Sequence, residues 1–224
     1  MKRITFFIVL ALLFTNCTKD DDIQDDQITD STGTYGTVVG ANGKIWLDRN
    51  VGATQVATSS TDKDGYGDLF QWGRLDDGHQ VRTSPTTTTL SNSDAPGNGN
   101  FIKLTSSPFD WRSPQNDNLW QGVNGTNNPC PNGYRLPTEA EWETERSSWN
   151  TNGAAGAFAS TLKLPMNGLR DNNDGTVLYE GTSGHYWSST VNDVNVRDFW
   201  LNSNGAGMSL SKRANGLSCR CIKD

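Results

Sequence analysis

The sequence predicts an α+β domain with one main helix, short antiparallel strands and long ordered loops. One segment, 138–149, has the cap and the spacing of an amphipathic helix. The last third of the chain alternates short extended segments with turns rich in Gly, Asn and Asp. The 224 residues include 8 Trp and 23 Gly but few long aliphatic side chains, which indicates a loop-rich domain around a small aromatic core.

The N-terminus has the layout of a secretory signal. Lys2 and Arg3 precede an apolar run, 4–14, whose 11 residues are too few to span a bilayer as a helix. Cys17 follows shortly after, and this arrangement resembles the lipobox of bacterial lipoproteins, in which the signal is cut before a Cys that carries lipid. We therefore expect a signal peptide at 1–16 and a lipid anchor at Cys17. The alternative is an ordinary secretory signal with an incidental Cys17.

An acidic segment, 17–32, follows the signal. It contains six Asp, one Lys and no aromatic residue. Such a segment cannot bury enough apolar surface to offset its ordering entropy, so we expect a disordered tether. Its Lys-Asp-Asp run resembles the surface-export signal of lipoproteins in the Bacteroidota, which implies an outer-membrane, surface-exposed protein. The alternative is a solvated spacer without an address.

The charge balance argues against one class of partner. Beyond residue 16 the chain has 17 basic and 25 acidic residues, and residues 33–224 have 16 and 19. A net charge of −3 leaves the domain without the basic surface that nucleic acid or an anionic membrane surface requires. Residues 33–224 are enough for a single domain with its own core.

Two strands are predicted near the start of the domain, at 34–39 and 43–48, because the turn Gly-Ala-Asn-Gly between them favours a hairpin. From Leu75 to about Asn128 the chain is mostly Thr, Ser, Asn, Asp, Pro and Gly. Loops of this length are usually functional or disordered. Regularly spaced Trp and Phe residues favour ordered coil attached to a core.

The segment 138–149 is the one helix predicted. Thr138 is a favourable N-cap, and Glu141 three residues later completes a capping box. Trp142 and Trp149 lie near one face, so that face is expected to pack and the charged side to be solvated. Extended segments then follow at 162–170, 176–180, 185–190, 196–202, 207–210 and 216–224.

The cysteines indicate one disulfide. A secretory signal implies an oxidising compartment, and with Cys17 lipidated the remaining cysteines are Cys130, Cys219 and Cys221. Residues 219 and 221 would face the same side of a strand. Either could therefore reach Cys130, but not both, and one thiol is left over.

Five motifs occur in order across nearly the whole domain: KIWLDRN, YGDLFQWGR, CPNGYRLPTEAEW, GHYWSST and GLSCRCIKD. Together they resemble the Fibrobacter succinogenes major paralogous domain family. That family is similar to the C-type-lectin-like and sulfatase-modifying-factor-like folds, so the resemblance implies such a fold for 33–224. The family's C-terminal Cys matches Cys221, which implies a Cys130–Cys221 disulfide.

Fold similarity does not decide activity. The stretch 135–142 also resembles the formylglycine-generating enzymes, which use two Cys near the C-terminus with four residues between them. Here Cys219 and Cys221 have one residue between them. His185 lies near Ser188 and Ser189, but packing of a family strand explains all three. We therefore expect a non-enzyme without a cofactor, and keep a copper oxidase of the formylglycine-generating type as an alternative.

Two carboxylate-rich turns, 62–68 and 171–175, have ligands suited to Ca²⁺. Neither has the EF-hand spacing, and turns of this composition are favoured by backbone geometry alone. We predict no metal site.

The Trp residues supply the candidate binding site. Those within the motifs are expected in the core: Trp46, Trp72, Trp142 and Trp187. Trp111 and Trp120 lie in the long polar segment with Asn116 and Asp117 between them, and Trp200 also lies outside the motifs. Exposed indoles beside amides and carboxylates would form a carbohydrate platform. The alternative is that these rings pin the loop to the core.

These features predict a cell-surface lipoprotein that acts as a non-catalytic recognition module for glycan or protein ligands. Its expected partners are the membrane, through the anchor at Cys17, and a glycan or a surface protein. The alternatives are a structural or adhesive component of a surface assembly, or the copper oxidase.

Overall fold

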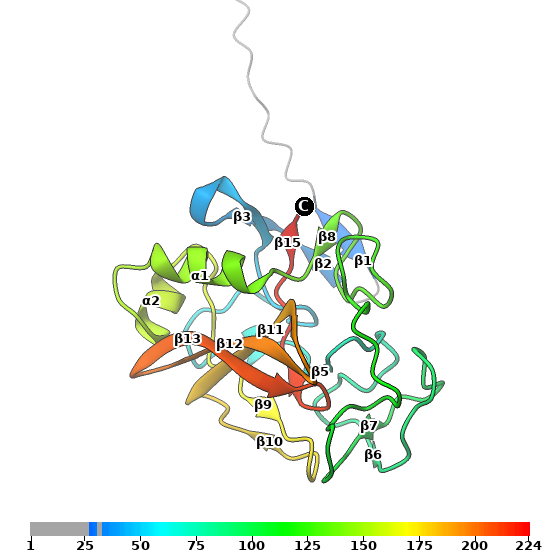
Figure 1. The fold of residues 1–224 in the computed structure, drawn as a ribbon. Helices are drawn as coiled ribbons and strands as arrows, with labels where there is room; N and C mark the ends of the chain where they lie inside the picture. Colours follow the sequence, from blue (N-terminus) through cyan, green and yellow to red (C-terminus); the bar gives the residue numbers. More distant parts are fainter. Residues whose placement is uncertain (1–26, 31–32) are drawn as a thin grey trace, which may run out of the picture.

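The computed structural model describes residues 27–30 and 33–224. The predicted signal peptide, Cys17 and most of the acidic segment lie outside the described residues. The described chain is an α+β structure of short, mainly antiparallel strands with one main helix (Figure 1). Among these residues, none of the helices has the length and apolar character needed to cross a bilayer.

The helices are α1 (Glu139–Ser147) and α2 (Ala154–Ala159). Single turns of 3-10 helix occur at Ala41–Gly43 and Lys63–Gly65. The strands are β1 (Ile28–Asp30), β2 (Gly33–Tyr35), β3 (Thr37–Val39), β4 (Ile45–Leu47), β5 (Phe70–Gln71), β6 (Thr86–Thr87), β7 (Phe101–Ile102), β8 (Tyr134–Arg135), β9 (Leu169–Arg170), β10 (Val177–Leu178), β11 (Ser183–Asn192), β12 (Asn195–Asn202), β13 (Gly205–Lys212), β14 (Gly216–Leu217) and β15 (Ile222–Lys223).

Regular structure begins earlier than the composition of 17–32 predicts. β1 pairs with β2, and Ile28 lies opposite Tyr35. The prediction of a tether reaching residue 32 is therefore wrong for 28–30. The reason is local: Ile28 packs against the core cluster that contains Tyr35, a contact that the average composition of the segment does not reveal.

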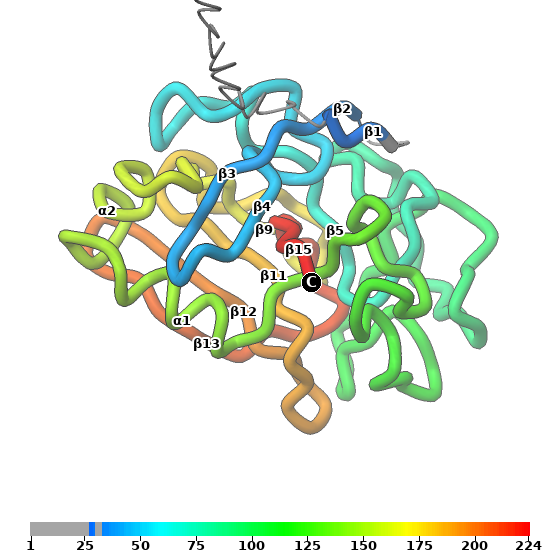
Figure 2. The backbone as a smooth tube through the Cα atoms, turned by 90° about the horizontal axis from the view of Figure 1, so that it is seen from above, coloured from blue at the N-terminus to red at the C-terminus, as the bar shows by residue number. Residues whose placement is uncertain are grey.

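The predicted hairpin is confirmed, since β3 pairs with β4 and Val38 lies opposite Trp46. The last strand, β15, lies between β4 and β8, so that Ile222 faces both Trp46 and Arg135. Figure 2 shows this C-terminal strand in the middle of the molecule, beside segments from much earlier in the chain. The β3–β4 hairpin and the last strand of the chain therefore lie in one sheet.

The capping box at the start of α1 is confirmed. The Glu141 N–H donates to Thr138 Oγ1 at 3.2 Å, and the Thr138 N–H donates to Glu141 Oε2 at 2.8 Å. The second helix, α2, is absent from the sequence prediction. It forms from small residues that pack closely, and a Cβ at Gly156 would collide with the carbonyl of Thr151.

The strands β11, β12 and β13 form an antiparallel sheet that separates two core clusters. One face carries Tyr186 and Phe199, and Phe199 stacks on Trp142 of α1 with ring centroids 4.8 Å apart. Figure 1 shows α1 and α2 over this face. The other face carries Trp187 and Val196, which belong to the second cluster.

The long segment 75–128 contains only β6 and β7, yet it is tied to the core by side chains. Arg74 donates to the carbonyls of Asn98 and Asn100 at 2.7 and 2.9 Å. The Asn127 amide donates to the carbonyls of Gly73 and Asp94 at 2.9 and 2.7 Å. The prediction of ordered coil attached to a core is confirmed.

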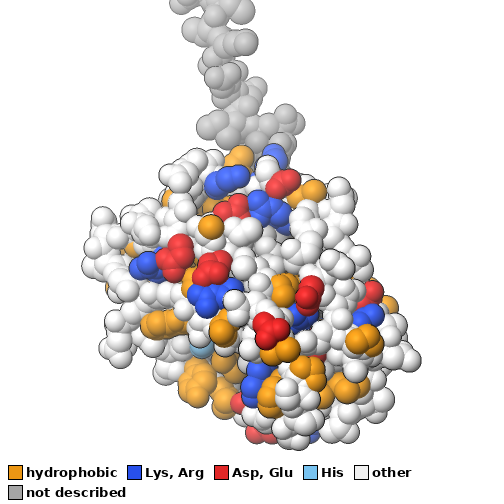
Figure 3. Space-filling model, in the orientation of Figure 1, with side chains coloured by type: hydrophobic (Ala, Val, Ile, Leu, Met, Phe, Trp, Pro, Cys, Tyr) orange, Lys and Arg blue, Asp and Glu red, His pale blue; other side chains and the backbone are white. Residues whose placement is uncertain are grey.

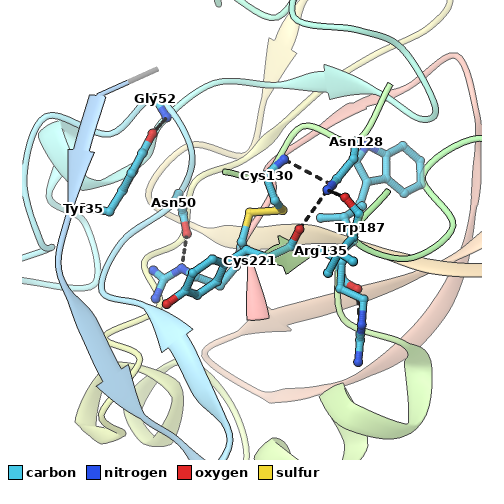
Figure 4. Close-up of a disulfide and its surroundings, with 12 residues drawn as sticks. Tyr35, Asn50, Gly52, Asn128, Cys130, Arg135, Trp187 and Cys221 are labelled. Carbon is cyan, nitrogen blue, oxygen red and sulfur yellow. Dashed lines mark hydrogen bonds between the residues drawn. A yellow bond between two sulfur atoms is a disulfide. The ribbon is translucent and has the colours of Figure 1, made fainter. Parts of the chain in front are cut away.

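A disulfide joins Cys130 to Cys221, with Cα atoms 5.8 Å apart, as the family resemblance implies (Figure 4). It connects the loop before β8 to the residue before β15. Asn128 holds this loop in shape, because its Oδ1 accepts from the Cys130 N–H at 3.2 Å and its Nδ2 donates to the Tyr134 carbonyl at 2.8 Å. Cys219 is a free, buried cysteine.

Candidate functional site

Six of the eight Trp side chains are fully buried: Trp46, Trp72, Trp111, Trp120, Trp142 and Trp187. The core placement predicted for the four Trp of the family motifs is therefore confirmed. Only Trp149 and Trp200 keep partial exposure. Any aromatic recognition surface of the described residues that uses indole rings must therefore lie at these two positions.

The predicted platform of Trp111 and Trp120 is wrong, because both side chains are 0 % exposed. Trp111 Nε1 donates to the Trp72 carbonyl at 2.7 Å, and the Trp120 ring packs edge-on against Trp72 with centroids 5.8 Å apart. The alternative holds: these rings pin the long loop to the core. Burial of two large apolar rings offsets the entropy of ordering a polar loop.

Asn116 and Asp117 take part in the same attachment. The Asn116 amide donates to Asp94 Oδ1 at 3.1 Å. Asp117 Oδ1 accepts from Nη2 of the buried Arg213 at 2.6 Å. The structure therefore gives both residues contacts that hold the loop, and the Trp rings that flank them in the sequence offer no surface for a ligand.

Trp200 is partly exposed and lies on the face of the β11–β12–β13 sheet opposite the helix-covered one. It is opposite His185 of β11 and Gly207 of β13. A Cβ at Gly205 would come 3.6 Å from Trp200 Cη2, and one at Gly207 would come 3.7 Å from Trp200 Nε1. The indole ring therefore lies across two glycines, which bring no side chain between the ring and the sheet.

Polar groups surround this ring. His185 Nε2 is 3.0 Å from Ser183 Oγ, and Asn202 is opposite Ser183 on the neighbouring strand. Tyr179, which is 57 % exposed, has its ring centroid 6.5 Å from that of His185. We call Tyr179, Ser183, His185, Trp200 and Asn202 the open sheet face. Figure 3 shows hydrophobic side chains gathered beside a histidine on the lower part of the molecule.

A buried carboxylate lies behind this face. Asp198 is 2 % exposed, and its Oδ2 is 3.5 Å from His185 Nδ1. Within the described residues, Asp198 Oδ1 and His185 Nδ1 have no hydrogen-bond partner. The carboxylate and Ser183 thus lie on either side of the imidazole.

The order Ser183, His185, Asp198 is that of a hydrolytic triad, but the hydrogen bonds differ. Ser183 Oγ lies 3.0 Å from His185 Nε2 and also 3.0 Å from the Leu201 carbonyl, to which it donates. Asp198 Oδ2, 3.5 Å from His185 Nδ1, does not make the hydrogen bond that orients the imidazole in a triad.

The serines that the sequence places near His185 point elsewhere. Ser188 Oγ donates to the Arg197 carbonyl at 2.7 Å, and Ser189 Oγ lies 3.4 Å from the Pro137 carbonyl. Both residues are buried, so they belong to strand packing.

The carboxylate-rich turns are explained by their own hydrogen bonds. Asp62 accepts from the N–H and the hydroxyl of Thr58, each at 2.8 Å, and these bonds lower the pKa of Asp62. Asp174 accepts from the Thr176 N–H at 2.8 Å, which lowers the pKa of Asp174. In the part of the chain that the structure describes, no three His, Cys, Asp or Glu side chains gather in a way that could hold a metal ion.

The second histidine, His79, is structural. Its Nε2 accepts from the Gln71 N–H at 3.0 Å, and its Nδ1 is 2.8 Å from Asp77 Oδ1. Complete burial lowers the pKa of His79 to about 4, so the ring is neutral at physiological pH.

The cysteine pair that the oxidase alternative requires is not formed. Cys221 is bonded to Cys130, and burial raises the pKa of the Cys219 thiol well above its usual value. A buried thiol of this kind is a poor source of thiolate for a metal.

The sequence patterns did not single out Trp200, although a signal was present. Alternation along β12 places Phe199 and Leu201 on the helix-covered face and Trp200 on the other. A hairpin turn at Ser203 and Asn204 brings the Gly-Ala-Gly run at 205–207 opposite Trp200. Comparison with known proteins finds no family model, no curated protein and no solved structure that matches this chain.

Proposed function

We propose that this protein is a non-catalytic recognition module that binds glycan on the open sheet face. The observation that carries the proposal is the partly exposed Trp200 ring lying across Gly205 and Gly207. The apolar face of a sugar ring packs on an indole, and its hydroxyls need hydrogen-bonding groups at the rim. The two glycines of β13 place no side chain against the Trp200 ring, so the indole offers such a surface.

The rim supplies hydrogen-bonding groups. Asn202 Oδ1 accepts from the N–H groups of Asn204 and Gly205 at 2.8 and 3.1 Å, which fixes the amide and leaves its NH₂ as a donor. The Asn152 amide lies near the same end of the ring, 3.7 Å from the position of a Cβ at Gly205, which is opposite Asn202. The Ser183 hydroxyl and the His185 imidazole are two further hydrogen-bonding groups on this face.

The proposal extends to the family and the location. Five motifs in family order and a disulfide at the implied pair of cysteines support a C-type-lectin-like fold of the Fibrobacter succinogenes major paralogous domain family. The N-terminal pattern supports an outer-membrane lipoprotein anchored through Cys17. Incorporation of labelled palmitate, lost in Cys17→Ser, tests the anchor.

A glycan array tests the recognition function. The chain from residue 17, with Cys17→Ser for solubility, is screened, and the best ligand is then titrated against Trp200→Ser. We expect Trp200→Ser to lose about tenfold or more in affinity, because the stacking surface is removed. Leu210→Ser, at an exposed apolar residue of β13 on the opposite face of the sheet, is the control and is expected to bind as the parent does. An array without any bound glycan, or equal affinity in Trp200→Ser, would count against the proposal and favour a structural role in a surface assembly.

A further inference from the structure

A second concave site lies on the helix-covered side of the molecule. It is a pocket of about 370 Å³ between the β3–β4 turn, the end of α1 and the segment 156–161 that includes the end of α2. A neighbouring hollow shares Ala41 and Ser148 with it. We call the first hollow the helix-end pocket. Because Trp149 lines it, it contains the second of the two partly exposed Trp residues.

The wall of this pocket contains a carboxylate group that two hydrogen bonds hold in place. Glu145 is 2 % exposed, its Oε2 accepts from the Ala41 N–H at 2.7 Å, and its Oε1 accepts from Trp149 Nε1 at 3.2 Å. Neither hollow is lined by Lys or Arg. Glu143 of the neighbouring hollow is already paired with Arg146 at 2.6 Å. Glu145 therefore dominates the charge of the pocket itself.

Arg220 is a buried cation whose charge acts on Glu145. Arg220 interacts with Glu145 through space, but its guanidinium donates to Asn50 Oδ1 at 3.0 Å and to the Leu162 carbonyl at 2.8 Å. No hydrogen bond or ion pair links it to Glu145 within the described residues. The helix α1 also ends at Ser147, so the negative end of its dipole lies at the pocket.

The Trp149 indole lies in the same wall of the pocket as Glu145. The Trp149 ring is held by its bond to Glu145 and by an edge-on contact with Phe199, whose centroid is 5.7 Å away. A cation near an aromatic face gains further attraction. Carboxylate, helix end and indole thus favour the same class of ligand.

Gly40 lines the pocket, and its lack of a side chain lets Trp46 and Glu145 pack closely against it. A Cβ at Gly40 would lie 2.7 Å from Trp46 Nε1 and 2.8 Å from Glu145 Oε2. Trp46 is 1 % exposed, and its Nε1 has no hydrogen-bond partner among the described residues. This N–H packs against Gly40 and Trp46 does not line the pocket, so a hydroxyl beside the cationic group must use the polar groups at the entrance. Asn150, Thr151 and Thr161 add polar groups around the entrance.

We propose that the helix-end pocket is a second ligand site, for a small organic ammonium ion that carries a neighbouring hydroxyl group, as an amino sugar does. This site uses none of the residues of the open sheet face. It therefore stands independently of the glycan function proposed for Trp200.

Titration by ¹H–¹⁵N NMR with glucosamine tests the proposal, with glucose as the neutral probe of matched shape. We expect glucosamine to shift the Trp149 Nε1–H resonance and glucose to leave it in place. Added salt is expected to weaken glucosamine binding, because part of the attraction is electrostatic. Equal shifts with both sugars, or none with glucosamine at its highest soluble concentration, would overturn the proposal.

Variants separate this site from the first. Glu145→Gln is expected to weaken glucosamine binding about tenfold or more, because the charge is lost while an oxygen acceptor remains. Glu143→Gln, which removes a carboxylate that lies outside the helix-end pocket and is paired with Arg146, is the matched control and is expected to bind glucosamine as the parent does. The comparison of glucosamine with glucose needs only the parent protein. It therefore tests the proposal even if Glu145→Gln does not fold. Loss of glucosamine binding in Trp200→Ser would place that ligand on the open sheet face instead.

Discussion

Arg135 donates two hydrogen bonds to Glu141, one to each carboxylate oxygen and each 2.8 Å long. The pair joins β8 to the first turn of α1, where Glu141 also accepts from the Thr138 N–H. Burial acts to raise the pKa of Glu141, but the hydrogen bonds from Arg135 and Thr138 and the charge of Arg135 outweigh it and lower that pKa to about 2.

Glu141→Gln is therefore expected to destabilise the protein in a pH-dependent way. The folded-state pKa lies below the ordinary value of 4.5, so the contribution is complete above about pH 4.5 and is lost as the pH falls towards 2. At neutral pH the loss should be about 1 to 2 kcal/mol, from the cap and the charged pair together. Urea unfolding near pH 7 and near pH 3 measures it. A difference from the parent that does not shrink in acid contradicts this account.

Asp68 gives the opposite pH dependence. Burial, and then the nearby charge of Asp76, raise the pKa of Asp68 from 3.8 to about 6. The folded state therefore holds this proton more tightly, and stability falls as the pH rises from about 4 to about 6. Asp68→Asn should stabilise the protein near pH 8 by up to about 3 kcal/mol and should have little effect near pH 4. Asp64→Asn, in an exposed part of the same loop, is the control in the same unfolding series.

The Cys130–Cys221 bridge should dominate the effect of cysteine substitutions. Replacing both residues by Ser is expected to cost about 2 to 4 kcal/mol, because the bridge constrains a long loop of the unfolded chain. With Cys17→Ser, a thiol reagent should find no reactive group in the native protein and one after denaturation, from the buried Cys219. Two thiols after denaturation without reductant would show that the bridge is not formed.

Acrylamide quenching should divide the Trp fluorescence into a large protected part and a small accessible part. Six indoles are buried, and only Trp149 and Trp200 are partly exposed. The double variant Trp149→Phe, Trp200→Phe should therefore lose most of the quenchable emission. A quenchable component that survives in this variant would place another Trp at the surface.

Features that depend on neighbours in the chain were predictable. Thr138 and Glu141 satisfy each other's N–H groups across three residues, so their spacing is enough to predict the start of α1. The β3–β4 hairpin likewise follows from a short turn between two extended segments. The Cys130–Cys221 pairing followed from resemblance, since spacing left Cys219 equally able to reach Cys130.

Exposure was decided only by the tertiary structure. Trp111 and Trp200 both lie outside the motifs, yet one donates to the carbonyl of Trp72, 39 positions away, and the other lies across glycines of a neighbouring strand. Glu145 is a helix residue that meets its second partner, the Ala41 N–H, only when the β3–β4 turn docks beside α1. The sequence by itself determined the start of α1, the β3–β4 hairpin and the α+β class. Which aromatic and charged groups face solvent depended on packing between distant segments, because burial is a property of those contacts and not of spacing.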